Sequence, residues 1–192
     1  MTPALFLDRD GVINVDHGYV HRAEETQFVA GIFDLVRAAN ERQWPVVVVT
    51  NQAGIGRGFY TEEIFHSYMK WMSAQFVEQG ARLDHVYFCP HHPTYGQGVY
   101  GVMCNCRKPA PGMFLQAIAE HGIDPSQSVM VGDSSKDAVA ALAAGVGRMF
   151  LLGDGLNRRE VPVDAVQNIR SLAELKELLS ASDLCGFKVH RS

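Results

Sequence analysis

The sequence predicts an α/β fold, a Rossmann-like and doubly wound, mostly parallel sheet with helices on both faces. Two observations carry this prediction. Short apolar runs, such as the β-branched segment 45–49, are too uniformly apolar for strands with one face in water, and are typical of strands buried on both faces. Segments with helical spacing of apolar residues separate these runs, and this alternation favours a parallel sheet covered on both sides.

The expected strands share a short length and an apolar character, and several end at a polar residue. They comprise residues 4–7, 45–49, 85–88, 128–131 and 148–152. Between the second and third of them, Thr61 is expected to cap a helix whose first turn holds Glu62 and Glu63, where acidic side chains favour the helix dipole.

Further helices are expected from periodicity and from residues that begin or end a helix. Ile32, Leu35, Val36 and Ala39 recur at helical spacing. The helices over 113–121 and 136–144 are each followed by a glycine, which is the residue that most often ends a helix. Ser171 and Glu174 have the spacing of a capping box ahead of a last helix.

Length and composition predict one domain and exclude some functions. We expect residues 1–180 to form a single domain and 181–192 a loosely held tail, because 192 residues suit one domain of ordinary size. The net charge of -4 argues against nucleic acid and against anionic membrane surfaces as partners. No apolar run reaches the roughly 18 residues of a membrane span, and no leader is evident. A cytoplasmic location is therefore expected, and a monomer is expected because nothing in the sequence suggests an obligate assembly.

Polar side chains follow the predicted strands at their carboxyl ends. Asp8 and Asp10 follow the first strand, and Asp133 follows the fourth. Thr50 ends the second strand, and the third leads into Cys89. Carboxyl ends of parallel strands meet at one edge of the sheet, where ligands bind. Because Mg²⁺ prefers a few carboxylates together with substrate phosphate and water, the three aspartates predict a magnesium site.

A phosphoryl group at such a site needs a nucleophile, hydrogen-bond donors around its oxygens and an acid for the leaving group. Asp8 is the candidate nucleophile, and Asp10 is the candidate acid that then activates water. Thr50 and Asn51 can donate hydrogen bonds to the phosphoryl oxygens. Lys108 can neutralise the charge that gathers there. These residues predict phosphoryl transfer through an aspartyl-phosphate.

Three of the four cysteines cluster in or beside the long irregular segment 89–112, together with histidine. Three thiolates and one imidazole suit a closed, tetrahedral zinc site, which would be structural and would pin this loop. The candidate Zn²⁺ ligands are Cys89, His91, Cys104 and Cys106. Spacing alone leaves His92 open as an alternative to His91.

Four segments in this order resemble the haloacid dehalogenase (HAD) superfamily of phosphatases. They are residues 8–11, 50–51, 108–109 and 132–133. The resemblance implies a Rossmann-like core, Mg²⁺ and an aspartate nucleophile. It also implies that the Asp8 carboxylate is both nucleophile and metal ligand, and that Asp10 binds the metal through its main-chain carbonyl.

A finer resemblance is to the D-glycero-D-manno-heptose-1,7-bisphosphate 7-phosphatases, and it rests on residues 6–11, 14–20, 50–52, 89–93 and 104–109. It implies hydrolysis of the 7-phosphate in the synthesis of ADP-heptose and lipopolysaccharide core precursors, and it favours His91 as the zinc ligand. That family often has lysine where this chain has Ser134, which leaves one substrate contact unmatched. The substrate-binding residues that the resemblance implies are Asp16, His17, Gly18, Tyr19, Thr50, Asn51, Gln52, Ala53, Arg107 and Lys108.

Two alternatives stay open at this point. Histidinol-phosphate phosphatases resemble the chain in the aspartate motif and the zinc loop, although residues 16–20 favour the heptose enzyme. A non-catalytic, zinc-containing module that binds a phosphorylated ligand is the alternative from another class, and the intact pair Asp8 and Asp10 argues against it. The chain is too short for a large cap domain, so we expect a substrate whose second phosphate anchors it, with Arg57 and Arg107 as candidate cations.

Overall fold

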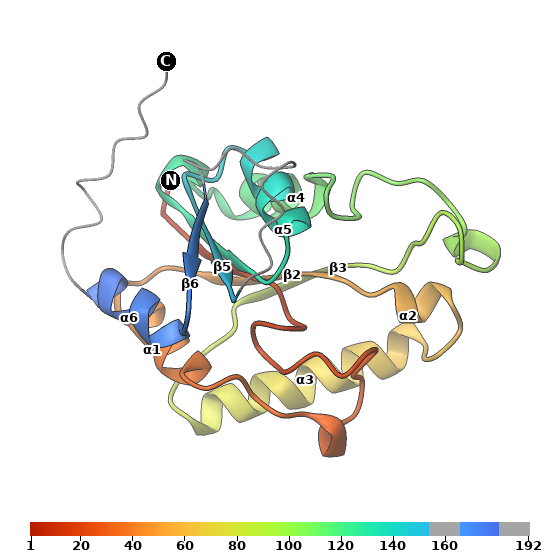
Figure 1. Ribbon diagram of the computed structural model, residues 1–192, viewed down its shortest axis with the longest axis horizontal. Coiled ribbons are helices and arrows are strands. Elements are labelled where there is room, and N and C mark those ends of the chain that lie inside the picture. The colour runs from red at the N-terminus through yellow and green to blue at the C-terminus, as the bar shows by residue number, and fades with distance from the viewer. Residues whose placement is uncertain (154–165, 181–192) are drawn as a thin grey trace.

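A six-stranded parallel sheet organises the computed structural model, which describes residues 1–153 and 166–180 (Figure 1). The strand order is β3-β2-β1-β4-β5-β6, and every neighbouring pair is parallel. The direction of winding reverses between β1 and β4, which is where such sheets bind ligands. The strands are β1 (Leu5–Leu7), β2 (Val46–Asn51), β3 (His85–Cys89), β4 (Val129–Gly132), β5 (Arg148–Leu152) and β6 (Val166–Ile169).

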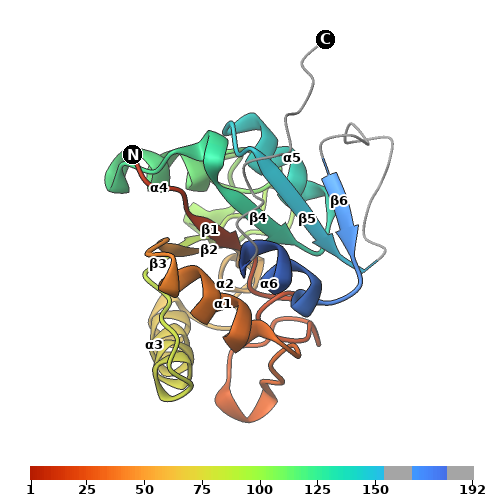
Figure 2. The same cartoon turned by 90° about the vertical axis from the view of Figure 1, so that its left-hand side faces the viewer.

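Helices cover both faces of the sheet, as the doubly wound prediction requires. One face is covered by α1, α3 and α6, and the other by α4 and α5 (Figures 1 and 2). No helix of the described ranges has the length and apolar character needed to cross a membrane. The helices are α1 (Ile32–Glu41), α2 (Ala53–Gly56), α3 (Glu62–Glu78), α4 (Gly112–His121), α5 (Ser135–Ala143) and α6 (Leu172–Ser180).

The core forms because strand side chains alternate between the two faces. In β1, Leu5 and Leu7 pack with α1 and α3, whereas Phe6 points the opposite way and contacts Phe114 of α4 at 5.1 Å between ring centroids. All of these side chains are fully buried. Burying both faces of the central strands leaves their carboxyl ends as the place for polar chemistry.

Most predicted helix boundaries are confirmed by local contacts. The Thr61 hydroxyl accepts a hydrogen bond from the main-chain N–H of Ile64 at the start of α3. Gly122 ends α4 in the left-handed conformation. At α6, Glu174 accepts hydrogen bonds from the main chain of Arg170 and from the Ser171 hydroxyl.

Strand β6 was not predicted, because its two central residues are exposed and polar. The prediction of a loosely held tail over 181–192 falls outside the described residues, and no further domain is inserted within them.

Candidate active site and zinc-binding cluster

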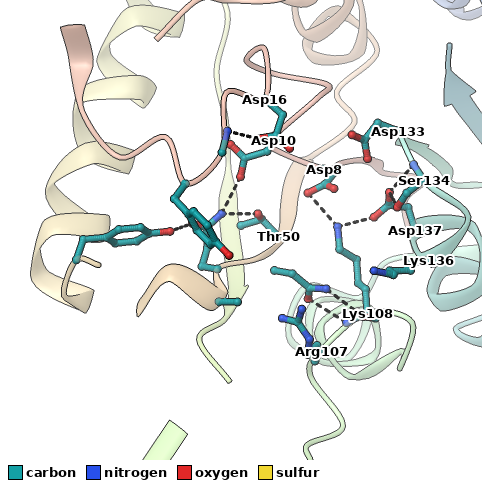
Figure 3. A pocket seen from close by; sticks show the side chains of 16 residues that line it. Asp8, Asp10, Asp16, Thr50, Arg107, Lys108, Asp133, Ser134, Lys136 and Asp137 are labelled. Carbon is teal, nitrogen blue, oxygen red and sulfur yellow. Dashed lines mark hydrogen bonds and ion pairs between the residues drawn. The ribbon is translucent and has the colours of Figure 1, made fainter. Parts of the chain in front are cut away.

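A cleft of about 400 Å³ opens at the carboxyl ends of β1, β2 and β4 (Figure 3). Its volume is within the range typical of small-molecule sites. Polar and charged side chains dominate its walls, and they come from strand ends and from the segments that follow them. The lining residues are Asp8, Asp10, Asp16, Gly18, Tyr19, Thr50, Asn51, Gln52, Ala53, Tyr60, Arg107, Lys108, Asp133, Ser134, Lys136 and Asp137.

Lys108 lies at the base of this cleft with its ammonium between two carboxylates. Its Nζ is 2.9 Å from Asp8 Oδ1 and 2.5 Å from Asp137 Oδ1 (Figure 3). It also donates to the main-chain oxygen of Val49 at 2.8 Å. The lysine side chain is almost completely buried. Burial acts to lower the pKa of Lys108, but Asp137 and Asp8 together raise it above its usual range, so the ammonium stays charged.

Asp133 completes a set of carboxylates that could hold a metal ion. Oxygen atoms of Asp8, Asp133 and Asp137 lie within 4.8 Å of one another. Asp8 Oδ1 is already bonded to Lys108 and to its neighbour's main-chain N–H, and Asp137 is occupied by Lys108 and by the start of α5. Asp8 and Asp133 are therefore the two carboxylates best placed for a cation, and hard oxygen donors of this kind fit Mg²⁺.

The charge balance of the cleft also fits a bound cation. Burial raises the pKa of Asp8 well above its usual range, Lys108 counteracts this, and Asp137 adds to it. Burial and the nearby Asp137 raise the pKa of Asp133 to about 6. Three carboxylates thus face one ammonium, and a divalent cation between Asp8 and Asp133 would favour the ionised form of both.

The Asp10 carboxylate points to a different set of partners. It accepts hydrogen bonds from Arg9 Nη2 at 2.7 and 2.8 Å, from Asn14 Nδ2 at 3.0 Å and from Gln52 Nε2 at 3.1 Å. Arg9 is fully buried, and its guanidinium lies against the ring of Tyr68 at 5.2 Å. Asp10 lines the cleft together with Asp8. Strand β1 ends at Leu7, so Asp10 belongs to the turn that follows the strand.

The end of β2 forms the opposite wall with a connected set of hydrogen bonds. Gln52 Nε2 donates to the Thr50 hydroxyl at 2.7 Å, and Gln52 Oε1 accepts from the Tyr60 hydroxyl at 2.6 Å. The Asn51 side chain exchanges two hydrogen bonds, both 3.0 Å long, with the main chain of Lys108. Asn51 therefore holds the main chain of Lys108 in place. The Thr50 hydroxyl accepts from Gln52, so its own hydrogen can still be donated to a ligand in the cleft.

The predicted substrate loop lies along one rim of the cleft. Asp16, Gly18 and Tyr19 line it, and Asp16 Oδ1 accepts a hydrogen bond of 2.8 Å from the main chain of Gly18. His17 lines a neighbouring hollow with Glu25 instead of this cleft. A substrate contact by His17 stays a prediction.

Two cations on the other rim carry fewer internal contacts than Lys108. Arg107 donates one hydrogen bond to the main-chain oxygen of His91 at 3.1 Å. Lys136 lines the cleft and makes no hydrogen bond or ion pair within the described residues. Arg57, the other cation proposed from the sequence for a second phosphate, does not line the cleft. Ser134 caps α5 by exchanging hydrogen bonds with Asp137.

The cysteine cluster forms beside the cleft in the predicted combination. The sulfur atoms of Cys89, Cys104 and Cys106 lie 3.2–3.5 Å apart, and His91 Nδ1 lies 3.3 Å from Cys106 Sγ. All four ligand atoms fall within 4.8 Å of one another, which suits one tetrahedral Zn²⁺.

His92 has a separate structural role. Its Nδ1 accepts hydrogen bonds of 3.2 Å from the main-chain N–H groups of Thr94 and Tyr95. This geometry favours His91 over His92 as the fourth ligand of the cluster, because His91 Nδ1 lies beside the sulfur atoms of Cys89 and Cys106 while His92 Nδ1 caps a turn.

Sequence reasoning did not single out three residues at the site: Asp137 and Tyr60 line the cleft, and Arg9 is buried against Asp10. Asp137 had a usable signal, since Ser134 and Asp137 have the spacing of a capping box at the start of a predicted helix. Arg9 and Tyr60 had no such signal in the sequence. Arg9 bonds to Asp10 in its own turn, and Tyr60 bonds to Gln52, eight residues away.

Comparisons with known proteins agree with this geometry. A family model described as HAD-hydrolase-like matches residues 105–175. The chain is 51% identical over 153 residues to the D-glycero-β-D-manno-heptose-1,7-bisphosphate 7-phosphatase of Vibrio cholerae serotype O1, covering 80% of this chain and 82% of that protein. It is 47% identical over 182 residues to the enzyme of the same name from Yersinia pestis, covering 93% and 96%.

Solved structures give the same likeness. A crystal structure of D,D-heptose 1,7-bisphosphate phosphatase from B. bronchiseptica, complexed with magnesium and phosphate, matches with a TM-score of 0.79 and 29% identity. The match covers 93% of this chain and 98% of that chain. A crystal structure of a protein from Mesorhizobium loti that is described as HAD-like matches with a TM-score of 0.83 and 33% identity, covering 93% of this chain and 86% of that chain.

We expect Gly11→Ala to weaken Mg²⁺ binding about tenfold or more. Gly11 has φ +82°, and a Cβ there would lie 2.1 Å from Asp133 Oδ2, so the carboxylate must move. Gly18→Ala is the matched control, because Gly18 has φ +83° but open space around its Cβ. Calorimetric titration with Mg²⁺ measures both variants. Equal loss of affinity in the two would attribute the effect to backbone strain and contradict the placement of Asp133 at the ion.

Proposed function

We infer the activity of this chain from its family, because it belongs to the D-glycero-β-D-manno-heptose-1,7-bisphosphate 7-phosphatases, a group of HAD-like hydrolases. The chain is a phosphatase, and its proposed reaction is removal of the 7-phosphate from a heptose 1,7-bisphosphate. This step would serve the synthesis of ADP-heptose and lipopolysaccharide core precursors. The observation that carries the proposal is the meeting of Asp8, Asp133 and Lys108 in one cleft.

The proposed mechanism uses Asp8 as the nucleophile. Its carboxylate oxygen forms a bond to phosphorus while the bond from phosphorus to the sugar oxygen breaks. Asp10 donates a proton to the departing sugar oxygen. Asp10 then takes a proton from water, and the water oxygen attacks phosphorus, which releases phosphate and restores Asp8. The hydrogen bonds from Arg9, Asn14 and Gln52 fix the orientation of the Asp10 carboxylate, which lines the same cleft as Asp8.

The remaining catalytic groups are proposed to stabilise the phosphoryl oxygens. Thr50 would donate its hydroxyl hydrogen to one of them, and the Lys108 ammonium would offset their charge. Mg²⁺, held by Asp8, Asp133 and the carbonyl of Asp10, would add positive charge that aligns the phosphoryl group with the nucleophile. The magnesium and phosphate in the B. bronchiseptica structure support Mg²⁺ as the cation of this site.

Recognition of a bisphosphorylated sugar is proposed to divide between the two rims of the cleft. Arg107 and Lys136 would hold the phosphate that does not react, because both are cations with donors to spare. Asp16 and Tyr19 on the opposite rim offer acceptors and an aromatic surface to sugar hydroxyls. The open cleft favours a small substrate that brings its own second anchor. Monomeric state and cytoplasmic location remain predictions.

A comparison of substrates tests the proposal. We expect phosphate release from the β anomer of the heptose bisphosphate, the anomer in the names of the relatives, to exceed that from histidinol phosphate and from fructose bisphosphate by about a hundredfold or more in kcat/KM. Removal of Mg²⁺ should abolish all turnover. The α anomer belongs in the same panel. Preference for histidinol phosphate would instead support the alternative phosphatase, and absence of turnover with every substrate would support a binding module.

Asp8→Asn is expected to lower turnover at least about a thousandfold, because the amide is a poor nucleophile and the intermediate cannot form. The variant should keep its circular dichroism spectrum and its zinc content. Asp34→Asn, at an exposed carboxylate on α1, is the control and should be as active as the unmodified chain. Activity retained by Asp8→Asn would exclude the covalent mechanism.

The cysteine cluster is proposed to bind one structural Zn²⁺ per chain. We expect Cys106→Ser to lose this ion and to lower the midpoint of thermal unfolding by about 5 °C or more, because the loop ahead of Arg107 is no longer closed. Elemental analysis and thermal unfolding measure both effects. Cys185→Ser, which changes the remaining cysteine, should keep the ion. A full complement of zinc in Cys106→Ser would exclude this ligand set.

A further inference from the structure

Arg57 lies at the centre of an aromatic cluster just outside the cleft. Its guanidinium carbon is 5.4 Å from the ring centroid of Tyr19, 5.0 Å from that of Phe59 and 5.1 Å from that of Tyr95. Its Nη1 also donates a hydrogen bond to the Tyr19 hydroxyl. A guanidinium at these distances is attracted to the faces of aromatic rings. We call Arg57 with these three rings the Arg57 bridge.

The bridge joins segments that are far apart in the sequence. Tyr19 belongs to the rim of the cleft, whereas Tyr95 belongs to the irregular segment that carries the cysteine cluster. The main chain around Arg57 is tied to that segment as well. Gln97 donates its main-chain N–H to Gly56 at 2.7 Å, and Gln97 Nε2 donates to the main-chain oxygen of Arg57 at 3.3 Å. The main chain of Arg57 is thus held by Gln97, and its side chain reaches Tyr19.

Tyr19 is a residue that needs such support. Its φ of 57° is in the left-handed region, which a side chain with a Cβ rarely adopts. Two contacts hold the main chain around Tyr19. Asp16 Oδ1 accepts a hydrogen bond from the main-chain N–H of Gly18, and His21 Nδ1 lies 2.7 Å from the main-chain oxygen of Tyr19. Tyr19 is 39% exposed, and the described partners of its ring are Arg57 and the ring of Phe59, which packs edge to face with a distance of 4.7 Å between ring centroids.

Arg57 is placed to act on the substrate through Tyr19. It does not line the cleft, and its charged group faces three rings and a tyrosine hydroxyl. A residue that bound the second phosphate directly would have to leave these contacts. We propose that Arg57 is a positioning residue, which holds Tyr19 at the rim of the cleft in the conformation that receives the sugar. The inference rests on the proposed function.

Kinetics of Arg57→Met test this role. We expect KM for the heptose bisphosphate to rise roughly tenfold, with kcat within about twofold of the unmodified chain, because substrate binding weakens while the reacting groups stay in place. Turnover of acetyl phosphate, which has no sugar to reach Tyr19, should be unchanged. Arg57→Lys keeps the charge but loses the planar group, and should give an intermediate KM.

Arg42→Met is the matched control. Arg42 lies over the Trp44 ring at 5.3 Å and donates to a main-chain oxygen, so it makes the same kinds of contact away from the cleft. The KM of Arg42→Met for the heptose bisphosphate should not change.

Tyr19→Phe in combination with Arg57→Met separates a positioning role of Arg57 from direct contact with the substrate. The double variant should be no worse than Arg57→Met alone, and additive effects would show that the two residues bind substrate independently and would overturn the proposal.

Hydrogen exchange tests the inference without any substrate. Main-chain amides of residues 16–20 should exchange at least about threefold faster in Arg57→Met than in the unmodified chain, and Arg42→Met should leave them unchanged. Unchanged exchange in Arg57→Met would overturn the inference even if the enzyme accepts the heptose bisphosphate. Faster exchange in a chain that proves inactive on that sugar would leave the positioning of Tyr19 intact and place the failure in the proposed substrate.

Discussion

The buried ammonium of Lys108 is the constraint on which the rest of the active site depends. A charge out of contact with water must be paired, and here Asp8 and Asp137 pair with it at 2.9 and 2.5 Å. Asp8 follows β1, Asp137 lies in α5, and Lys108 comes from the loop after the cysteine cluster. The ion pairs therefore connect both sides of the point where the winding of the sheet reverses, and they fix the position of Asp8, the proposed nucleophile.

The loops around the cleft are ordered by side chains, because they have little regular secondary structure of their own. The cysteine cluster brings together the two ends of the irregular loop ahead of Arg107. The two hydrogen bonds that the Asn51 side chain exchanges with the main chain of Lys108 hold this lysine against the end of β2. On the opposite rim, the contacts of Arg57 hold Tyr19. An open cleft without an inserted cap requires such local supports, since no lid is available among the described residues to arrange the substrate.

Much of the fold and part of the site could be predicted from single residues and their neighbours. The β-branched run of β2 and the helix that begins after Thr61 are local features, and both are confirmed. Strand β6 was missed because an edge strand needs few apolar residues, and Val166 and Ile169 alone do not identify one. Arg9 was missed because nothing in its sequence context indicates burial beneath Asp10.

The sequence by itself determined the alternation of strands and helices, the carboxylates at the strand ends and the residues of the cysteine cluster, since periodicity, turn chemistry and ligand spacing are local properties. The tertiary structure alone decided that Asp137 shares Lys108 with Asp8, that His92 caps a turn while His91 joins the cysteines, and that Arg57 faces Tyr19. Each of these depends on which side chains meet after the chain has folded, and contact between distant segments leaves no periodic trace in the order of the residues.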